Sequence, residues 1–382
     1  MISVNKVIEE FSKHKYSLFK TFFPKSKYNF NLKKVKKFEK FETIIVIGMG
    51  GSVLGAKAIY SFLKHKINKK FIFIDNLDHG YLEAIKKKNN LNRVLFLIIS
   101  KSGNTTETIV NSSFFRSFLK KKNSIIISED KDNSLRSFAK KRSISFVRHH
   151  PNIGGRYSIF SDVGMLPVYF MGLSPEKFKK NIPNLLKNKK LLSRNIKKIS
   201  QINSKKIKVL VLFNYIPELK NFLFWFQQLL AESLGKNKKG FMPVVSNAPK
   251  DHHSLLQLYL DGPKDKAFYI FSSADKKRLK INSKIFGDRA KFLNKKKYEV
   301  VKLSQKNAFV AALKEKKIPF REIIIEKFDE NTLGKLFFLF IFETIAFSKI
   351  LKVNAFDQPA VERVKVLTKK LLISKKSSKK NF

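Results

Sequence analysis

From residue 41 onward, short runs of β-branched and aromatic residues alternate with longer amphipathic segments. The first four short runs are typical of strands, and they lie at 43–47, 70–75, 94–99 and 124–128. Helical patterns separate them, at about 54–64, 81–88, 107–121 and 134–141. Nearly continuous apolar strands that alternate with helices predict a parallel sheet covered by helices on both faces. This part of the chain is therefore expected to form a doubly wound α/β domain.

The same alternation returns after a basic, polar stretch at 179–206. Strands are expected at 209–213, 267–272 and 322–325, with a long helix at about 217–234. We therefore predict two doubly wound parallel-sheet domains of flavodoxin-like type with a helical C-terminal segment. The expected limits are 1–40 for an N-terminal helical segment, 41–150 for the first domain, 151–206 for a connecting segment with helices, 207–330 for the second domain, and 331–382 for C-terminal helices and a basic tail. An apolar helix at 336–347 needs burial, for which the chain's own core is favoured over a partner.

Composition excludes several classes of protein. The chain has no cysteine, so it has no disulfide framework and no thiolate metal site, which favours a reducing cytoplasm. Its N-terminus lacks the pattern of a signal peptide, and its most apolar run, at 336–342, is far shorter than the ~20 residues of a membrane helix. We expect a soluble cytoplasmic protein without a membrane partner.

The charge balance is extreme, because 79 Lys and Arg against 29 Asp and Glu give a net charge of +50. Nucleic acid is the obvious partner to consider for such a chain. However, the lysines are spread along the whole sequence and accompany an excess of Phe, Ile and Asn, which indicates a compositional bias of the source. The sequence also has no recognisable recognition helix, RNA-binding aromatic motif or zinc site, so no specific nucleic-acid partner is expected.

Two loops carry the chemistry of the first domain. Gly48-Met49-Gly50-Gly51-Ser52-Val53-Leu54-Gly55 follows a strand and opens a helix, where glycines allow a sharp turn and a close approach to an anion. A tight turn without a ligand is the alternative, and Val53 stands where a dinucleotide motif needs its third glycine.

The second loop, Ser100-Lys101-Ser102-Gly103-Asn104-Thr105-Thr106-Glu107-Thr108, follows the third strand and also opens a helix. Five hydroxyl side chains and one lysine at a helix N-terminus suit a phosphate monoester, and an ordinary N-cap with Ser and Thr in the loop is the alternative. Ligands bind at the carboxyl ends of parallel strands, where both loops lie, and this favours phosphate.

The two loops resemble the sugar-isomerase (SIS) domain, a phosphosugar-binding module. Four further segments resemble, in the same order, motifs of the glucose-6-phosphate isomerase family. They are Gly154-Gly155-Arg156-Tyr157-Ser158 with Ser161–Pro167, Ala231-Glu232-Ser233-Leu234-Gly235-Lys236, His253-Ser254-Leu255-Leu256-Gln257 with Asp261–Pro263, and Phe356-Asp357-Gln358-Pro359 continuing to Lys365. The resemblance covers about 44–370.

The resemblance implies an aldose-ketose isomerase that acts on glucose 6-phosphate and fructose 6-phosphate without a metal or an organic cofactor. It also implies a homodimer in which the ring-opening histidine reaches the sugar of the partner chain. The alternatives are a dual phosphoglucose/phosphomannose isomerase and an SIS-type protein that binds phosphosugars without catalysis. At 382 residues the chain is short for the family, so we expect peripheral helices or loops to be trimmed.

The resemblance also implies roles for individual residues. Glu232 would be the general base, Arg156 would stabilise the enediolate, and His253 and Lys365 would open the sugar ring. His252 beside His253 leaves that assignment ambiguous, although the spacing to Gln257 favours His253. The implied substrate-binding residues are Gly51, Ser52, Ser100, Lys101, Ser102, Thr105, Gln228 and Gln358.

The residues themselves agree with these roles at two points. Gln228 and Glu232 are four positions apart on an expected helix, so they share a face. Arg156 is one of few arginines in a lysine-rich chain, and a planar, permanently charged guanidinium suits an enediolate. Asn104 departs from the family, in which many members carry Thr, and this removes one hydroxyl from the loop.

Overall fold

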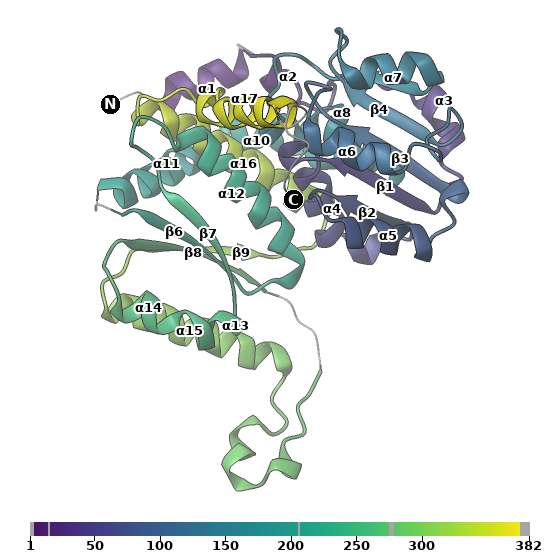
Figure 1. Ribbon diagram of the computed structural model, residues 1–382. Helices are drawn as coiled ribbons and strands as arrows, with labels where there is room; N and C mark the ends of the chain where they lie inside the picture. The colour runs from purple at the N-terminus through teal and green to yellow at the C-terminus, as the bar shows by residue number, and fades with distance from the viewer. Residues whose placement is uncertain (1–3, 14–15, 205–206, 275–278, 375–382) are drawn as a thin grey trace.

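The structure is a computed structural model that describes residues 4–13, 16–204, 207–274 and 279–374. Two parallel β-sheets organise it, with strand orders β2-β1-β3-β4-β5 and β7-β6-β8-β9 (Figure 1). The strands are β1 (Thr43–Gly48), β2 (Lys70–Ile74), β3 (Val94–Ile99), β4 (Ser124–Ser128), β5 (Ser145–Arg148), β6 (Val209–Asn214), β7 (Met242–Asn247), β8 (Lys266–Ser273) and β9 (Phe320–Ile325). The predicted fold class of two parallel-sheet α/β domains is confirmed.

Helices cover the sheets and connect the strands. They are α1 (Val4–Ser12), α2 (Ser17–Lys20), α3 (Leu32–Val35), α4 (Leu54–Phe62), α5 (His79–Lys88), α6 (Thr106–Phe114), α7 (Ser134–Arg142), α8 (Asp162–Phe170), α9 (Pro175–Lys179), α10 (Ile182–Lys187), α11 (Lys189–Ser204), α12 (Lys220–Leu234), α13 (Lys250–Ser254), α14 (Leu256–Asp261), α15 (Tyr298–Glu315), α16 (Glu330–Ile350) and α17 (Pro359–Ser374). The basic tail expected at the end of the chain lies outside the described residues after 374, and the predicted domain limits stay a prediction.

Both faces of each sheet are buried. In β1, Ile44 and Val46 belong to the large core that joins the two sheets, whereas Ile45 and Ile47 belong to a second core beneath α5 and α7. In β6, the alternate residues divide between the large core and a third core under α14 and α15. Strands that are apolar on both faces are typical of parallel sheets, and they give continuous apolar runs in the sequence.

The large core is built around α16, which carries the apolar segment 336–347. Phe337, Phe340 and Phe347 are at most 2% exposed, so this segment is buried within the chain's own core, as favoured from the sequence. The one carboxylate in the segment, Glu343, is also buried. It accepts hydrogen bonds from Arg321 Nη1 at 2.6 Å and from the Tyr269 hydroxyl at 2.9 Å, which satisfies the charge inside the core.

The sequence pattern did not predict the edge strands β5 and β7, and it predicted one helix that is longer than the one observed. β5 has four residues, and β7 contains Pro243, which is tolerated only because β7 lies at the edge of its sheet. The helix expected at 107–121 ends at Phe114 instead. The side chain of Asn123 bonds to backbone atoms of Phe118 and Lys120, which stabilises turns in place of further helix.

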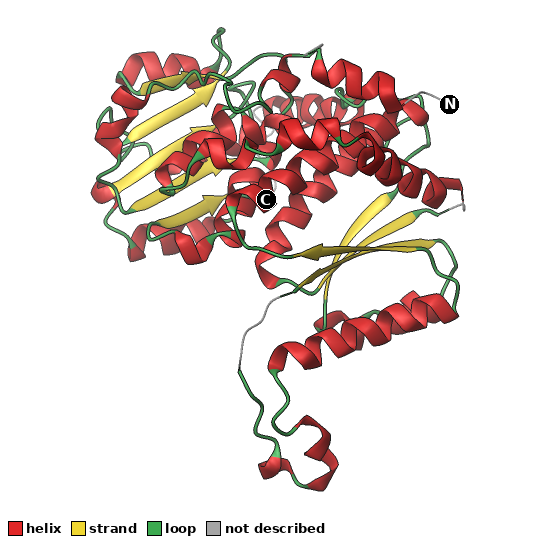
Figure 2. Ribbon diagram, turned by 180° about the vertical axis from the view of Figure 1, so that it is seen from behind, coloured by secondary structure: helices red, strands yellow, loops and turns green. Residues whose placement is uncertain are grey.

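Two parts of the chain carry many exposed apolar side chains. The projecting arm, residues 279–297, extends away from the second sheet (Figures 1 and 2). The helix α17 has no buried residue along its whole length. Within the described residues, no helix combines the length and the apolar character needed to cross a membrane.

Candidate active site

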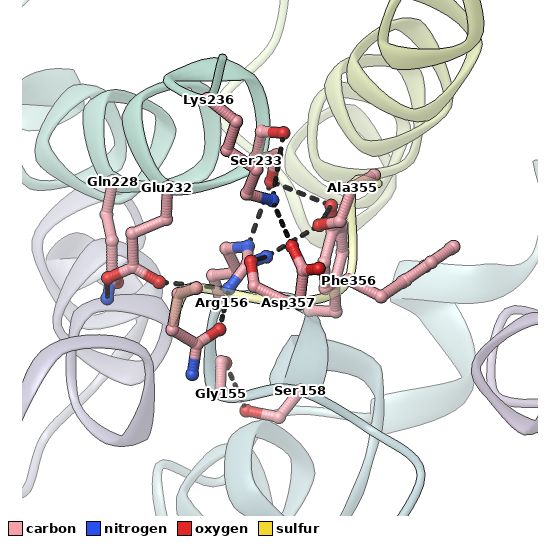
Figure 3. Close-up of polar contacts among 12 residues, drawn as sticks. Gly155, Arg156, Ser158, Gln228, Glu232, Ser233, Lys236, Ala355, Phe356 and Asp357 are labelled. Atoms are coloured by element: carbon pink, nitrogen blue, oxygen red, sulfur yellow. Dashed lines mark hydrogen bonds and ion pairs between the residues drawn. The ribbon is translucent and has the colours of Figure 1, made fainter. Parts of the chain in front are cut away.

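The helix α12 presents the predicted base at its C-terminal end. Gln228 Nε2 donates to Glu232 Oε1 at 2.7 Å, which confirms that the two side chains share a face of the helix. Arg156 Nη1 donates to Glu232 Oε2 at 3.0 Å (Figure 3). The Arg156 side chain is 1% exposed and that of Glu232 is 29% exposed, so a molecule in solvent can reach the carboxylate but not most of the guanidinium.

Arg156 uses all of its N–H groups within the protein. Its acceptors are Ser233 Oγ for Nε (2.9 Å), Glu232 Oε2 (3.0 Å) and Gln358 Oε1 (2.7 Å) for Nη1, and the carbonyl oxygens of Ala355 (2.6 Å) and Asp357 (3.1 Å) for Nη2. The fork geometry of a guanidinium fixes its plane once these positions are set. The positive charge is therefore held at a fixed place beside the carboxylate of Glu232.

Several residues that the role assignment did not include support Arg156. The hydroxyl of Tyr157 lies 2.7 Å from Ser233 Oγ and donates to the Ala355 carbonyl oxygen at 2.9 Å. Lys236 forms an ion pair of 2.8 Å with Asp357. These contacts connect α12 to the loop at 354–358. Tyr157, Ser233 and Lys236 lie inside the sequence motifs, so the sequence could have indicated them. Ala355 contributes only its backbone carbonyl oxygen, which no residue type reveals.

The glycine loop after β1 packs against the same residues. Gly50 has a φ of +52°, and a Cβ atom there would lie 2.7 Å from Gln228 Nε2. A Cβ atom on Gly51 would lie 2.1 Å from the carbonyl carbon of Gly155. These glycines therefore allow the β1–α4 turn to approach α12 and the Arg156 segment, which places Gly50 and Gly51 against the site.

The hydroxyl loop lies beside the glycine loop. Gly48 of β1 pairs with Ile99 of β3, so both loops leave the sheet at adjacent carboxyl ends. Ser100 Oγ lies 2.8 Å from Thr105 Oγ1 and accepts from the Gly103 N–H at 3.2 Å. The loop therefore forms a compact turn that ends at the N-terminus of α6, where unpaired N–H groups attract anions.

Asn104 and Lys101 connect the hydroxyl loop to residues outside it. Asn104 Oδ1 accepts from the backbone N–H of Ser134 at 2.9 Å, so this departure from the family anchors the loop to α7. Lys101 Nζ lies 3.7 Å from Glu129 Oε1. Burial lowers the pKa of Lys101, and the neighbouring Glu129 opposes this effect.

Two predicted residues do not contact this cluster within one chain. His253 is exposed on α13 and forms no hydrogen bond with another described residue. Lys365 lies on α17, where its Nζ pairs with Glu362 at 2.7 Å and its side chain is 60% exposed. The structure thus joins Arg156, Gln228, Glu232 and Gln358, with Gly51 packed against them, and leaves His253 and Lys365 apart.

The position of His253 follows from the layers of the second domain. Figure 1 shows α12 and α13 on opposite faces of the second sheet. The cores agree, because α12 packs into the large core and the residues around α13 pack into the third core. Within the described residues, no group of three or more His, Asp or Glu side chains could hold a metal ion.

Comparisons with known proteins point to one family. The model of a family described as phosphoglucose isomerase matches residues 31–382. The curated glucose-6-phosphate isomerase of Methanocaldococcus jannaschii is 34% identical over 358 residues, which cover 90% of this chain and 88% of that protein.

Solved structures show the same fold. A hypothetical protein from Thermus thermophilus has a TM-score of 0.85 at 24% identity, with 97% of this chain and 94% of that chain covered. A glucose-6-phosphate isomerase from Chlamydia trachomatis has a TM-score of 0.76 at 20% identity, with 90% of this chain and 72% of that chain covered.

Proposed function

Because the chain belongs to the phosphoglucose isomerase family, we propose that it interconverts glucose 6-phosphate and fructose 6-phosphate. The observation that carries the proposal is the carboxylate of Glu232, held by Gln228 on one oxygen and by Arg156 on the other. A partly exposed carboxylate next to a buried, fixed cation suits proton transfer at a carbon beside a carbonyl group.

The reaction moves a proton between two carbons of the open-chain sugar. Glu232 takes the proton from C2 of the aldose, and the electron pair of that bond forms an enediolate with its negative charge on O1. Glu232 then returns the proton to C1, while the O2 hydroxyl proton passes to O1, which gives the ketose. The positive charge of Arg156, held 3.0 Å from Glu232 by contacts within the protein, stabilises the oxygen charge that develops.

Two glutamines are suited to hold the sugar. Gln228 Oε1 is buried and has no hydrogen-bond partner among the described residues, so it can accept from a sugar hydroxyl. Gln358 Oε1 accepts from Arg156 Nη1 at 2.7 Å, so the Gln358 amide N–H groups lie beside the same cation. The sugar phosphate would bind at the two loops, through Gly51 and Ser52 and through Ser100, Lys101, Ser102 and Thr105.

We propose that His253 and Lys365 open the sugar ring. The position of His253 in the fold then supports a homodimer. Since His253 and Glu232 lie on opposite faces of the second sheet, we propose that His253 serves the site of a second copy of the chain. His253 is exposed and has no hydrogen-bond partner among the described residues, as such a role requires.

The exposed apolar residues also support a homodimer. The projecting arm carries Ile285, Phe286 and Phe292 at 72–80% exposure, and α17 carries Val364 and Leu371 at 62–64%. Apolar side chains gathered on an arm and on a helix are typical of surfaces that a partner covers. A chain without cysteine that acts on a sugar phosphate is consistent with a cytoplasmic location, which we also propose.

A coupled assay with purified protein and fructose 6-phosphate tests the proposed activity. We expect turnover of fructose 6-phosphate to glucose 6-phosphate, with mannose 6-phosphate measured in parallel to detect a dual isomerase. Absence of turnover by a folded protein that still binds the sugar phosphate would contradict the proposal and favour a binding protein.

A further inference from the structure

Two adjacent histidines on α13 have opposite environments. His252 is partly buried and its ring packs against Phe213 of the third core, whereas His253 is exposed. Successive residues of a helix point in directions about 100° apart, so packing of the His252 ring against the third core turns His253 away from that contact. The contacts of His252 therefore determine where His253 points.

His252 is held by a hydrogen bond and by aromatic packing. Its Nε2 atom lies 2.7 Å from the hydroxyl of Tyr215. Its ring stacks on Phe213, with centroids 5.6 Å apart and planes 5° from parallel, and lies 5.9 Å from the ring of Phe309. Burial raises the pKa of Tyr215, so its hydroxyl keeps its proton and is able to donate a hydrogen bond to a neutral Nε2.

Asp251 attaches the same helix to the end of β7. Its Oδ2 atom accepts from the Asn247 N–H at 2.6 Å and from Ser246 Oγ at 2.8 Å. Its Oδ1 atom accepts from Ser254 Oγ at 3.2 Å. Asp251 therefore fixes the position of α13 along the strand, and His252 fixes its rotation.

We propose that His252 and Asp251 are positioning residues that hold α13 so that His253 projects toward the sugar ring bound by a second copy of the chain. This inference rests on the proposed function. It also decides between the two histidines, because the Nε2 atom of His252 is committed to Tyr215 and its ring packs against Phe213 and Phe309. Burial lowers the pKa of His252, which keeps it neutral and able to accept from Tyr215.

The test separates ring opening from proton transfer. Exchange between the α and β anomers of glucose 6-phosphate, measured by NMR saturation transfer, requires ring opening alone, whereas isomerisation requires both steps. We expect His252→Ala to slow both anomer exchange and isomerisation by about 10- to 100-fold, the size expected for a displaced reacting group. Glu232→Gln should do the opposite and lose isomerisation while it retains anomer exchange.

Conservative variants distinguish positioning from direct chemistry. His252→Gln places an amide oxygen within reach of the Tyr215 hydroxyl, so anomer exchange should stay within about 3-fold of the unmodified protein. Tyr215→Phe removes the hydroxyl that bonds to His252, so it should also slow anomer exchange, as His252→Ala does. His65→Ala, at an exposed histidine of the first domain, is the matched control and should have no effect.

Three results would overturn the inference. The first is normal anomer exchange in both His252→Ala and Tyr215→Phe. The second is a folded His252→Gln protein that loses anomer exchange as severely as His253→Ala does. The third is normal anomer exchange in His253→Ala. If the unmodified protein does not isomerise fructose 6-phosphate at all, the proposed function fails instead, and the two failures are distinct.

Discussion

The Nη1 atom of Arg156 lies 3.0 Å from the Oε2 atom of Glu232, although the two residues are 76 positions apart in the sequence. The guanidinium is buried and the carboxylate is partly open to solvent. Removal of the Glu232 carboxylate leaves a buried cation without its anionic partner, which lowers the free energy of unfolding. Removal of Arg156 leaves a carboxylate that solvent can reach, which costs less.

Glu232→Gln is expected to abolish isomerisation, because the amide keeps the shape of the side chain but cannot take a proton. Turnover should fall by about 100-fold or more, while binding of the sugar phosphate persists. The measurements are the coupled assay and calorimetric titration with fructose 6-phosphate. Glu315→Gln, at an exposed carboxylate on α15, should be without effect. Retention of more than about a tenth of the turnover by Glu232→Gln would mean that another group is the base.

Ser233→Ala is expected to lower turnover without a large change in KM. Ser233 is fully buried, and its Oγ atom accepts from Arg156 Nε at 2.9 Å, so its loss frees one edge of the guanidinium. A lost hydrogen bond to a charged group corresponds to about 1.5–3 kcal/mol, or roughly 10- to 100-fold if it is expressed in the transition state. Ser113→Ala, at an exposed serine of α6, is the control. Unchanged turnover in Ser233→Ala would show that Arg156 is held by its other contacts alone.

Lys179→Met is expected to stabilise the protein at neutral pH. Lys179 is 0% exposed, its Nζ atom donates to Ser26 Oγ at 2.7 Å, and burial lowers its pKa to about 7. The unfolded chain keeps this proton up to about pH 10, so between pH 7 and 10 the unfolded state binds more protons and the free energy of unfolding rises with pH.

This residue should contribute a slope of about 1.4 kcal/mol per pH unit within that window. Urea unfolding at pH 7 and pH 9 should show the rise in the unmodified protein and a smaller rise in Lys179→Met, with a gain of about 1–4 kcal/mol at pH 7. Lys177→Met, at an exposed lysine of the same helix, should leave the pH dependence unchanged. If the free energy of unfolding rises with pH as steeply in Lys179→Met as in the unmodified protein, Lys179 is not the source of that rise.

Mixing Glu232→Gln and His253→Ala subunits is expected to restore activity. Each homodimer should be nearly inactive, whereas a heterodimer carries one site with the intact Glu232 of one chain and the intact His253 of the other. The measurement is turnover after reversible dissociation and mixing, with heterodimers detected by a size tag on one subunit. If heterodimers form without any recovery, His253 serves its own chain and the proposed shared site is wrong.

The sequence by itself determined the two parallel sheets and the order of the chemical motifs. Strands buried on both faces, such as β1 and β3, are continuous apolar runs, and a run of this kind is visible without knowledge of its neighbours. The spacing of Gln228 and Glu232 also fixed their shared face, because helical periodicity is a local property. Edge strands such as β7 escaped detection, because a strand with one free edge tolerates Pro243 and exposed residues.

The tertiary structure alone decided how the site is assembled. The fixed plane of Arg156 depends on the carbonyl oxygens of Ala355 and Asp357, and a backbone acceptor has no residue type that a sequence could reveal. Which of His252 and His253 faces the core depends on the rotation of a five-residue helix, which the contacts with Phe213 and Tyr215 set. Local patterns therefore identified the candidate catalytic groups, whereas long-range packing determined which of them meet within one chain.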